Sequence, residues 1–210
     1  MCGIFFIKGF TNLNNLKIHF NKGNYRGPDN SYLKSINEST HIGFHRLSIN
    51  GLNEESNQPI IKNGIYLICN GEIYNFKELY LYLNLEPKTD SDCEIIIDLY
   101  LKYNIDYFIK LLDGVFSFVI YDSNKDLVIC ARDPFGVRPM FFNKNFTAFS
   151  SELKQLMFLD EEINQFPPGH YYTSVIGMNK YFTFSNIILA NCSDSFNYNT
   201  EYSFYTSIIK

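Results

Sequence analysis

The sequence contains no run of about 20 consecutive apolar residues, the length that a membrane-spanning helix needs. It also lacks a block of basic residues: the 18 Lys and Arg are scattered among 22 Asp and Glu, and the formal net charge is −4. Such a chain has no long-range attraction for nucleic acid or for an anionic membrane. We therefore expect no nucleic acid and no membrane as partners, and a small molecule as substrate.

The cysteines lack the spacing of a disulfide framework or a zinc site, because they include no C-x-x-C pair and are odd in number. The five are Cys2, Cys69, Cys93, Cys130 and Cys192. The apolar start "MCGIFFIKGF" is short, with no basic residues before it and no small-residue cleavage site after it, so it does not resemble a signal peptide. These features predict a cytoplasmic protein with reduced thiols.

Runs of β-branched and aromatic residues between turn residues predict many strands, and 46% hydrophobic residues suffice for a sizeable core. Many antiparallel pairs with few helices favour an α+β domain of stacked sheets covered by helices. Strands are predicted at 4–7, 41–47, 65–69, 115–121, 127–131, 139–142, 146–149 and 171–175, and helices at 76–83, 93–103 and 151–158.

Two local signals bear on where elements begin and end. Ser91 and Glu94 have the S-x-x-E spacing of a capping box ahead of the second predicted helix. From residue 184 the sequence becomes rich in Asn, Ser, Thr and Tyr. We therefore expect one domain over residues 1–183 and a linker or tail over residues 184–210.

Cys2 becomes the first residue if Met1 is removed, and removal is expected where the second side chain is small. A thiol attacks as its thiolate and needs a base. The α-amine of the same residue has a reference pKa near 8, so roughly 10% of it is unprotonated at pH 7. One residue then supplies nucleophile and base. The alternative is that Cys2 is a small apolar residue of a first strand, because free cysteine is commonly buried and inert.

Ten short motifs occur in order along the chain: "MCGIF", "RGPD", "RLSI", "QP", "NGEIYN", "SDCE", "DGVFSFVIYD", "RDPFGVRP", "SSELK" and "FPPGHYY". The set closely resembles the N-terminal glutaminase domain of glutamine-hydrolysing asparagine synthetases, which are class II glutamine amidotransferases with an N-terminal nucleophile (Ntn type). The resemblance covers about residues 2–182. Other class II members share the Cys start and the Asn-Gly, but not "RLSI" together with "NGEIYN".

The resemblance implies a four-layer αββα sandwich of two antiparallel sheets, and residues 1–183 would be the amidotransferase domain. Release of ammonia from an amide passes through a tetrahedral oxyanion and a thioester, so fixed donors must face the developing negative charge. By resemblance, the Asn70 side chain and the Gly71 backbone N–H hold this oxyanion, and Cys2 is the nucleophile. Taken alone, Asn-Gly after "IYLIC" is typical of a hairpin turn.

Free glutamine is a zwitterion, so its recognition needs a cation for the α-carboxylate. By resemblance, Arg46 gives that carboxylate a bidentate fork. The backbone beside it completes this part of the site, at Leu47, Ser48, Ile49 and Asn50. Without the resemblance, an isolated Arg46 is typical of the surface of a strand.

The α-ammonium of glutamine needs an anion. Asp92 matches the family's ammonium binder and Glu72 a further glutamine contact, beside Asn70 and Gly71. The alternative for Asp92 is a helix-start residue, because the helix dipole favours a carboxylate in the first turn. The alternative for Glu72 is a solvated charge in a loop.

By resemblance, Arg26 and its "RGPD" loop support the Cys2 amine and the pocket. Pro28 disfavours a helical conformation at Gly27, the residue before it. Asp133, Gly136 and Arg138 are expected to be structural turn residues. The four histidines are not spaced as metal ligands. The family often has a histidine two places before the arginine, where this chain has Phe44, and this departure concerns the packing around Arg46.

The family's larger half adenylates aspartate and carries an S-G-G-x-D-S phosphate loop; neither this loop nor a Walker loop occurs in the sequence. The resemblance predicts hydrolysis of L-glutamine to glutamate and ammonia, with the ammonia passing to a synthetase domain in cis or in trans for asparagine synthesis. No cofactor is implied for this half, since ATP and Mg²⁺ would act on the synthetase half. The alternatives are a glutaminase serving another acceptor enzyme and a non-catalytic glutamine-binding or docking module.

Overall fold

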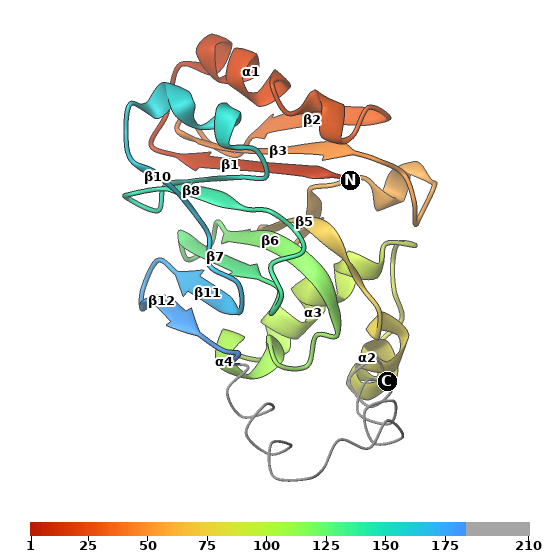
Figure 1. Ribbon diagram of the computed structural model, residues 1–210. Helices are drawn as coiled ribbons and strands as arrows, with labels where there is room; N and C mark the ends of the chain where they lie inside the picture. The colour runs from red at the N-terminus through yellow and green to blue at the C-terminus, as the bar shows by residue number, and fades with distance from the viewer. Residues whose placement is uncertain (184–210) are drawn as a thin grey trace, which may run out of the picture.

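The computed structural model describes residues 1–183, whose strands form two six-stranded sheets that lie face to face (Figure 1). The strands are β1 Gly3–Lys8, β2 Asn30–Ser35, β3 Thr40–Arg46, β4 Ile60–Lys62, β5 Ile65–Ile73, β6 Gly114–Asp122, β7 Leu127–Arg132, β8 Phe141–Asn143, β9 Ala148–Ser150, β10 Ile163–Gln165, β11 His170–Thr173 and β12 Gly177–Lys180. The α-helices are α1 Leu13–Asn21, α2 Phe76–Leu83, α3 Ile95–Lys102 and α4 Ile105–Phe108. Short 3₁₀ helices are η1 Asn24–Arg26, η2 Glu54–Ser56, η3 Asp92–Glu94, η4 Leu153–Gln155 and η5 Met157–Leu159.

The pairing of the strands is antiparallel throughout both sheets. Sheet A has the order β10-β8-β9-β1-β3-β2, and sheet B has the order β12-β11-β7-β6-β5-β4. Helix α1 covers the outer face of sheet A, and α2, α3 and α4 lie on the outer side of sheet B (Figure 1). The layers are therefore helix, sheet, sheet and helices.

The central strand of sheet A is apolar at successive positions because both of its faces are covered. In β1, Ile4 and Phe6 point into the core between the sheets, and Phe5 and Ile7 point into the core under α1. All four side chains are at most 1% exposed. The run "IFFI" therefore contributes side chains to two hydrophobic cores, one on each face of sheet A.

The central strands of sheet B alternate in the same way. In β5, Leu67 and Cys69 pack against the helices, whereas Ile68 packs between the sheets. In β6, Phe118 faces the helices and Val119 faces sheet A. This alternation produces three hydrophobic layers, and it confirms the predicted α+β fold of two antiparallel sheets in an αββα sandwich.

Some predicted elements differ from the structure. Helix α1 was not predicted, because only Leu16 and Phe20 are buried along it, and its start depends on the Asn12 side chain accepting a hydrogen bond from the Asn15 N–H. The helix predicted at 151–158 is wrong: this segment forms η4 and η5.

The predicted capping box is also wrong. Ser91 makes no side-chain capping bond. The Glu94 carboxylate instead accepts hydrogen bonds from the backbone N–H groups of Lys88 and Thr89, at 3.1 and 2.7 Å. Glu94 therefore holds the loop that precedes η3, although its spacing from Ser91 is that of a cap.

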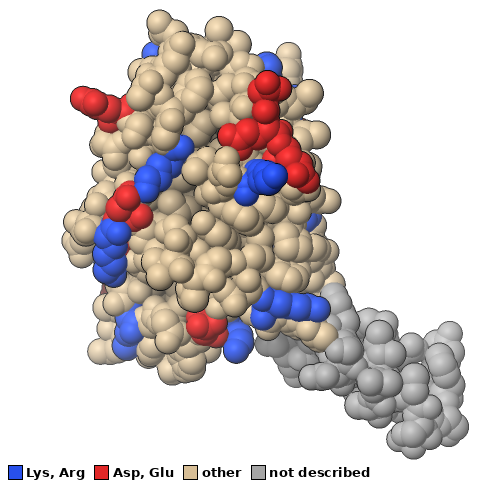
Figure 2. Space-filling model, turned by 90° about the vertical axis from the view of Figure 1, so that its left-hand side faces the viewer, with Lys and Arg blue, Asp and Glu red and all other residues tan. Residues whose placement is uncertain are grey.

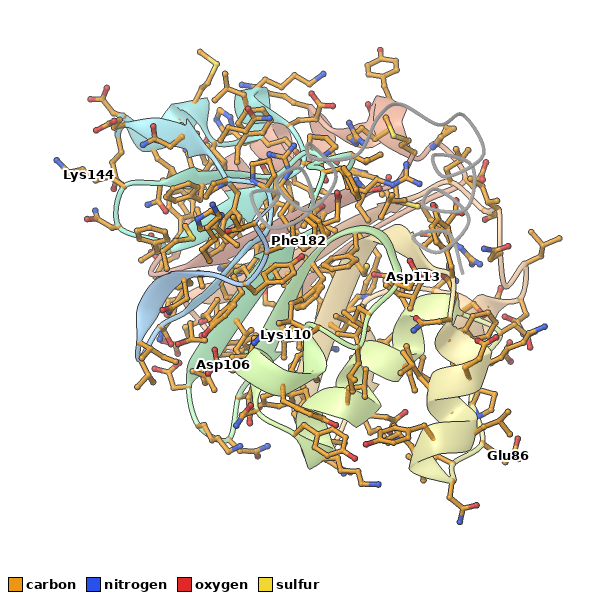
Figure 3. The ribbon with its side chains drawn as sticks, turned by 60° about the horizontal axis from the view of Figure 1, so that its bottom comes forward. Glu86, Asp106, Lys110, Asp113, Lys144 and Phe182 are labelled. Atoms are coloured by element: carbon orange, nitrogen blue, oxygen red, sulfur yellow. The ribbon has the colours of Figure 1, made fainter. Side chains whose placement is uncertain are left out.

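Positive and negative side chains are mixed on the surface of the described residues (Figure 2). The face in Figure 2 carries Lys and Arg side chains separated by acidic and uncharged ones. Figure 3 shows Asp106 and Lys110 on the helical side of sheet B, far from Lys144 in the β8–β9 turn. The Tyr171 hydroxyl donates a hydrogen bond to Asp106, which connects β11 to α4. No helix within residues 1–183 is long and apolar enough to cross a membrane.

Candidate active site

The thiol of Cys2 lies where the two sheets meet. Cys2 immediately precedes β1, and the pairing of Gly3 with His45 brings it beside the end of β3. Its Sγ accepts a hydrogen bond from the Leu47 backbone N–H at 3.4 Å and lies 3.5 Å from the Leu47 carbonyl oxygen. The start of the chain is next to the end of β5 (Figure 1). Residues distant in sequence thus converge at the thiol.

Arg26 fixes the backbone of the nucleophile from behind. Its Nε donates to the Cys2 carbonyl oxygen at 2.8 Å, and its Nη1 pairs with Glu152 Oε1 at 2.9 Å. The Ile4 N–H donates to Ser151 Oγ at 3.1 Å. The "RGPD" and "SSELK" motifs therefore meet at the first strand and hold the chain start in place.

A pocket opens in front of the thiol, between the ends of β3 and β5. Of the residues predicted for the site, Ser48 and Arg26 do not line it; the Ser48 N–H donates to Asp29 Oδ2 at 2.7 Å instead. The lining consists of Met1, Cys2, Phe44, Arg46, Leu47, Ile49, Asn50, Ser56, Gln58, Cys69, Asn70, Gly71, Glu72, Ser91, Asp92, Cys93 and Arg138.

Asn70 and Gly71 lie inside β5 and not in a hairpin turn, opposite Ser117 and Phe116 of β6. Asn70 is 1% exposed, and within residues 1–183 its Nδ2 has no hydrogen-bond partner. A Cβ at Gly71 would come within 2.5 Å of the Val115 carbonyl oxygen, so only glycine fits here. A buried donor without a partner is costly, and this one lines the pocket.

Arg46 is buried and not a surface residue. Its Nη1 donates to the Asn53 carbonyl at 3.0 Å and to Asn57 Oδ1 at 2.5 Å, and its Nη2 donates to the Gly51 carbonyl. Three of the five guanidinium N–H groups therefore hold the loop after β3. The Nε–Nη2 edge remains, which is a geometry that a carboxylate can accept in a bidentate manner.

The two acidic residues of the pocket have different environments. Asp92 starts the helical segment, as predicted, but its Oδ2 reaches across to accept the Ile73 N–H at 2.7 Å. Burial raises the pKa of Asp92 above its usual value, although the Ile73 N–H opposes this. Glu72 lies in β5 and not in a loop, with 36% of its side chain exposed, and pairs with Arg138 at 3.5 Å.

Several lining residues were not predicted for the site. Gln58 holds Cys69 through two hydrogen bonds, from its Nε2 to the Cys69 carbonyl at 3.1 Å and from the Cys69 N–H to its Oε1 at 2.6 Å. Gln58 and Arg138 belong to quoted motifs, so the signal was present but their roles were not. Cys93 lies in the quoted "SDCE" motif beside Asp92, and Cys69 directly precedes Asn70, so for these two residues the signal was their position next to predicted site residues.

The environment of the thiols differs with depth. Burial raises the pKa of Cys2, opposed by the hydrogen bond from Leu47. Contact with the Cys69 thiol and burial raise the pKa of Cys93 well above its usual value. All four described cysteines are free. Cys2 is therefore a neutral thiol at neutral pH unless a base takes its proton.

Phe44 stands where the family that the chain resembles often has a histidine, and its side chain packs in a core. Phe44 is 3% exposed, lines the pocket and belongs to the core between the sheets. His45 points to the other face, where its ring stacks on Phe20 with centroids 4.0 Å apart and its Nε2 lies 2.9 Å from the Phe20 carbonyl oxygen. His45 therefore takes no part in the pocket.

Within residues 1–183, no group of three or more His, Cys, Asp or Glu residues is arranged to hold a metal ion.

Solved structures share this architecture. The glutamine phosphoribosylpyrophosphate amidotransferase of Bacillus subtilis aligns with a TM-score of 0.71 at 19% identity, over 87% of this chain and 50% of that one. An allosteric regulatory enzyme of purine biosynthesis aligns with a TM-score of 0.69 at 18% identity, over 87% of this chain and 49% of that one. At this identity, the likeness establishes the fold.

The sequence model of the family described as "Glutamine amidotransferase domain" matches residues 1–191. The chain belongs to this family. It is 41% identical over 161 residues to a probable glutamine-hydrolysing asparagine synthetase of Schizosaccharomyces pombe, covering 71% of this chain and 28% of that protein. It is 41% identical over 168 residues to asparagine synthetase 1 of Saccharomyces cerevisiae (76% and 29%), and 33% identical over 196 residues to a probable asparagine synthetase of Acanthamoeba polyphaga mimivirus (90% and 36%). The predicted resemblance is confirmed, and the chain spans about a third of the length of these relatives.

Proposed function

We propose that the chain is a class II glutaminase in which Cys2, freed by removal of Met1, attacks the side-chain amide of L-glutamine. The Cys2 α-amine takes the thiol proton and passes it to the leaving ammonia. Water then hydrolyses the glutamyl thioester to release glutamate. The raised pKa of Cys2 agrees with this scheme, because a neutral thiol needs a base at the moment of attack.

The observation that carries the proposal is the Asn70 side-chain N–H. It is buried in the pocket and lacks a hydrogen-bond partner among residues 1–183, on the strand that also carries Gly71. A donor already desolvated and fixed by the sheet stabilises an oxyanion without reorganising. Asn70 Nδ2 and the Gly71 N–H would together bind the tetrahedral intermediate formed on Cys2.

The remaining polar groups suit the zwitterionic end of glutamine. The Nε–Nη2 edge of Arg46, beside the backbone from Leu47 to Asn50, would bind the α-carboxylate. Asp92 and Glu72 would bind the α-ammonium. Arg26 would support the reaction by fixing the Cys2 carbonyl. Substrate orientation along the line from Arg46 to Cys2 would then present the amide to the thiol.

We further propose that the ammonia serves asparagine synthesis on an aspartate-activating synthetase domain, in cis or in trans. The support is the similarity to asparagine synthetases, of which this chain spans 28–36%. The proposed glutaminase step uses no metal or organic cofactor. A reducing, cytoplasmic setting suits a reaction that depends on a free thiol.

The test combines intact mass with glutamine turnover. We expect a mass without Met1, hydrolysis of glutamine, and covalent labelling of Cys2 by a glutamine analogue that carries an electrophile. Asn70→Ala should lower kcat by about 100- to 1,000-fold. Retention of Met1 in active protein, or a Cys2→Ala variant as fast as the parent, would show that the mechanism is wrong. Binding of glutamine without labelling would indicate a non-catalytic module.

A further inference from the structure

The loop between β7 and β8 holds its backbone rigidly at the edge of the pocket. The Asp133 side chain is fully buried and accepts hydrogen bonds from the N–H groups of Phe135, Val137 and Arg138 at 3.0 to 3.1 Å. Arg132 Nε also donates to the Arg138 carbonyl at 2.7 Å. Hydrogen bonds to both the N–H and the carbonyl oxygen of Arg138 therefore fix its backbone.

The side chain of Arg138 faces the pocket and is incompletely satisfied. It lines the pocket with 15% of its area exposed, and its Nη2 lies 3.5 Å from Glu72 Oε1, the outer limit of a hydrogen bond. Its Nε is buried and has no partner within residues 1–183. A rigid backbone thus presents a guanidinium with unused donors to the carboxylate of Glu72.

The charges of the pocket explain what this guanidinium does. Arg46 spends three N–H groups on the loop after β3, and its two remaining N–H groups are the ones assigned to the α-carboxylate of glutamine. Glu72 projects from β5 with about a third of its side chain in solvent, and its ion-pair partner among the described residues is Arg138. Without that partner the carboxylate would sample several rotamers, and ordering it on substrate binding would cost affinity.

We propose that Arg138 is a positioning residue that holds the Glu72 carboxylate toward the α-ammonium of the amino-acid substrate. It acts through Glu72 and does not touch the reacting amide. The inference rests on the proposed glutaminase function, and it assigns to "RDPFGVRP" a role in substrate affinity beyond that of a structural turn.

The Arg138–Glu72 pair acts on the binding of the substrate's α-ammonium and takes no part in the attack by Cys2. We therefore expect Arg138→Ala to raise the KM for glutamine about twofold to fivefold, the range of a partly exposed ion pair, with kcat unchanged. Glu72→Gln should raise KM at least as much, because it removes the carboxylate itself. The double variant should be no worse than Glu72→Gln, since Arg138 acts only through Glu72.

The measurement is a double-mutant cycle on KM and kcat, with the Kd of glutamine measured by calorimetry on the same variants carrying Cys2→Ala. Lys125→Ala removes one positive charge from the exposed β6–β7 turn and is the matched control, with KM unchanged. If Arg138→Ala does not fold, Arg138→Gln replaces it in the cycle. Increases in KM that multiply in the double variant, or a loss confined to kcat, would overturn the positioning role. A parent chain that neither hydrolyses nor binds glutamine would overturn the proposed function as well.

Discussion

At the scale of the residue, Asp92 shows a conflict between binding and stability. Its carboxylate is buried beside the pocket and accepts the Ile73 N–H, yet burial still raises its pKa above the ordinary 3.8. A carboxyl with a higher pKa in the folded than in the unfolded state favours folding most below pH 3.8. That advantage is lost as the pH rises through the folded pKa. The ionised side chain that suits an ammonium group therefore destabilises the fold at neutral pH.

We expect Asp92→Asn to raise the thermal midpoint at pH 7 by about 2–4 °C, which corresponds to about 1 kcal/mol in a domain of this size. The amide can still accept the Ile73 N–H, and it cannot ionise. The gain should disappear when unfolding is measured below pH 3.8, where the parent carboxyl is protonated in both states. Glutamine affinity should fall in the same variant. Equal midpoints at pH 7 would contradict the burial argument.

At the scale of the element, the site depends on how closely neighbouring segments approach. The turn after η1 touches the end of β3, and a Cβ at Gly27 would lie 2.4 Å from the carbonyl carbons of His45 and Arg46. That contact is backbone on backbone, so no side chain can move aside. The space at Gly27 therefore sets the position of Arg46 relative to Arg26.

Gly27→Ala should destabilise the protein by about 1–3 kcal/mol through overpacking. It should also lower kcat/KM by about 100-fold, because the strand end that carries Arg46 must shift. Denaturant unfolding and glutamine turnover measure the two effects. Gly177→Ala is the control: its φ of +84° makes alanine costly by about 1–2 kcal/mol, but its Cβ meets nothing within 4 Å. Similar activity in the two variants would contradict this account.

At the scale of the whole molecule, the described pocket lies within the first 183 residues. The lining residues named above and the three hydrophobic layers are described for this part of the chain. The predicted boundary at residue 183 lies at the end of the described residues, and the predicted linker or tail at 184–210 lies outside them. The family match continues to residue 191. The boundary therefore stays a prediction.

A chain of residues 1–183 is expected to unfold in one cooperative transition and to hydrolyse glutamine with a kcat/KM within about threefold of the 210-residue chain. The reason is that Cys2, Arg46, Asn70 and Asp92, together with their hydrogen bonds described above, lie within residues 1–183. Calorimetry and steady-state kinetics on both chains measure this. A truncated chain that is insoluble or inactive would show that residues beyond 183 belong to the domain.

The sequence by itself determined the layers of this fold. The apolar runs of β1, β5 and β6 require cover on both faces, because an exposed face would alternate with polar residues. The fold prediction is confirmed because it depends on periodicity, which the chain carries whatever its tertiary contacts. The site residues were assigned by resemblance to a family; Cys2, Asn70 and Asp92 are among those that line the pocket, and their roles stay predictions.

The tertiary structure alone decided which polar groups face one another. Whether Asn-Gly is a turn or part of a strand depended on nine residues of β5 pairing with β6. Whether Glu94 caps a helix depended on the position of Lys88 and Thr89. Arg138 meets Glu72 because the ends of β5 and of the β7–β8 loop lie together. Such pairings are set by the order of the strands and the path of the loops. No local pattern encodes them, because the partners lie far apart in sequence: Arg138 and Glu72 are 66 residues apart.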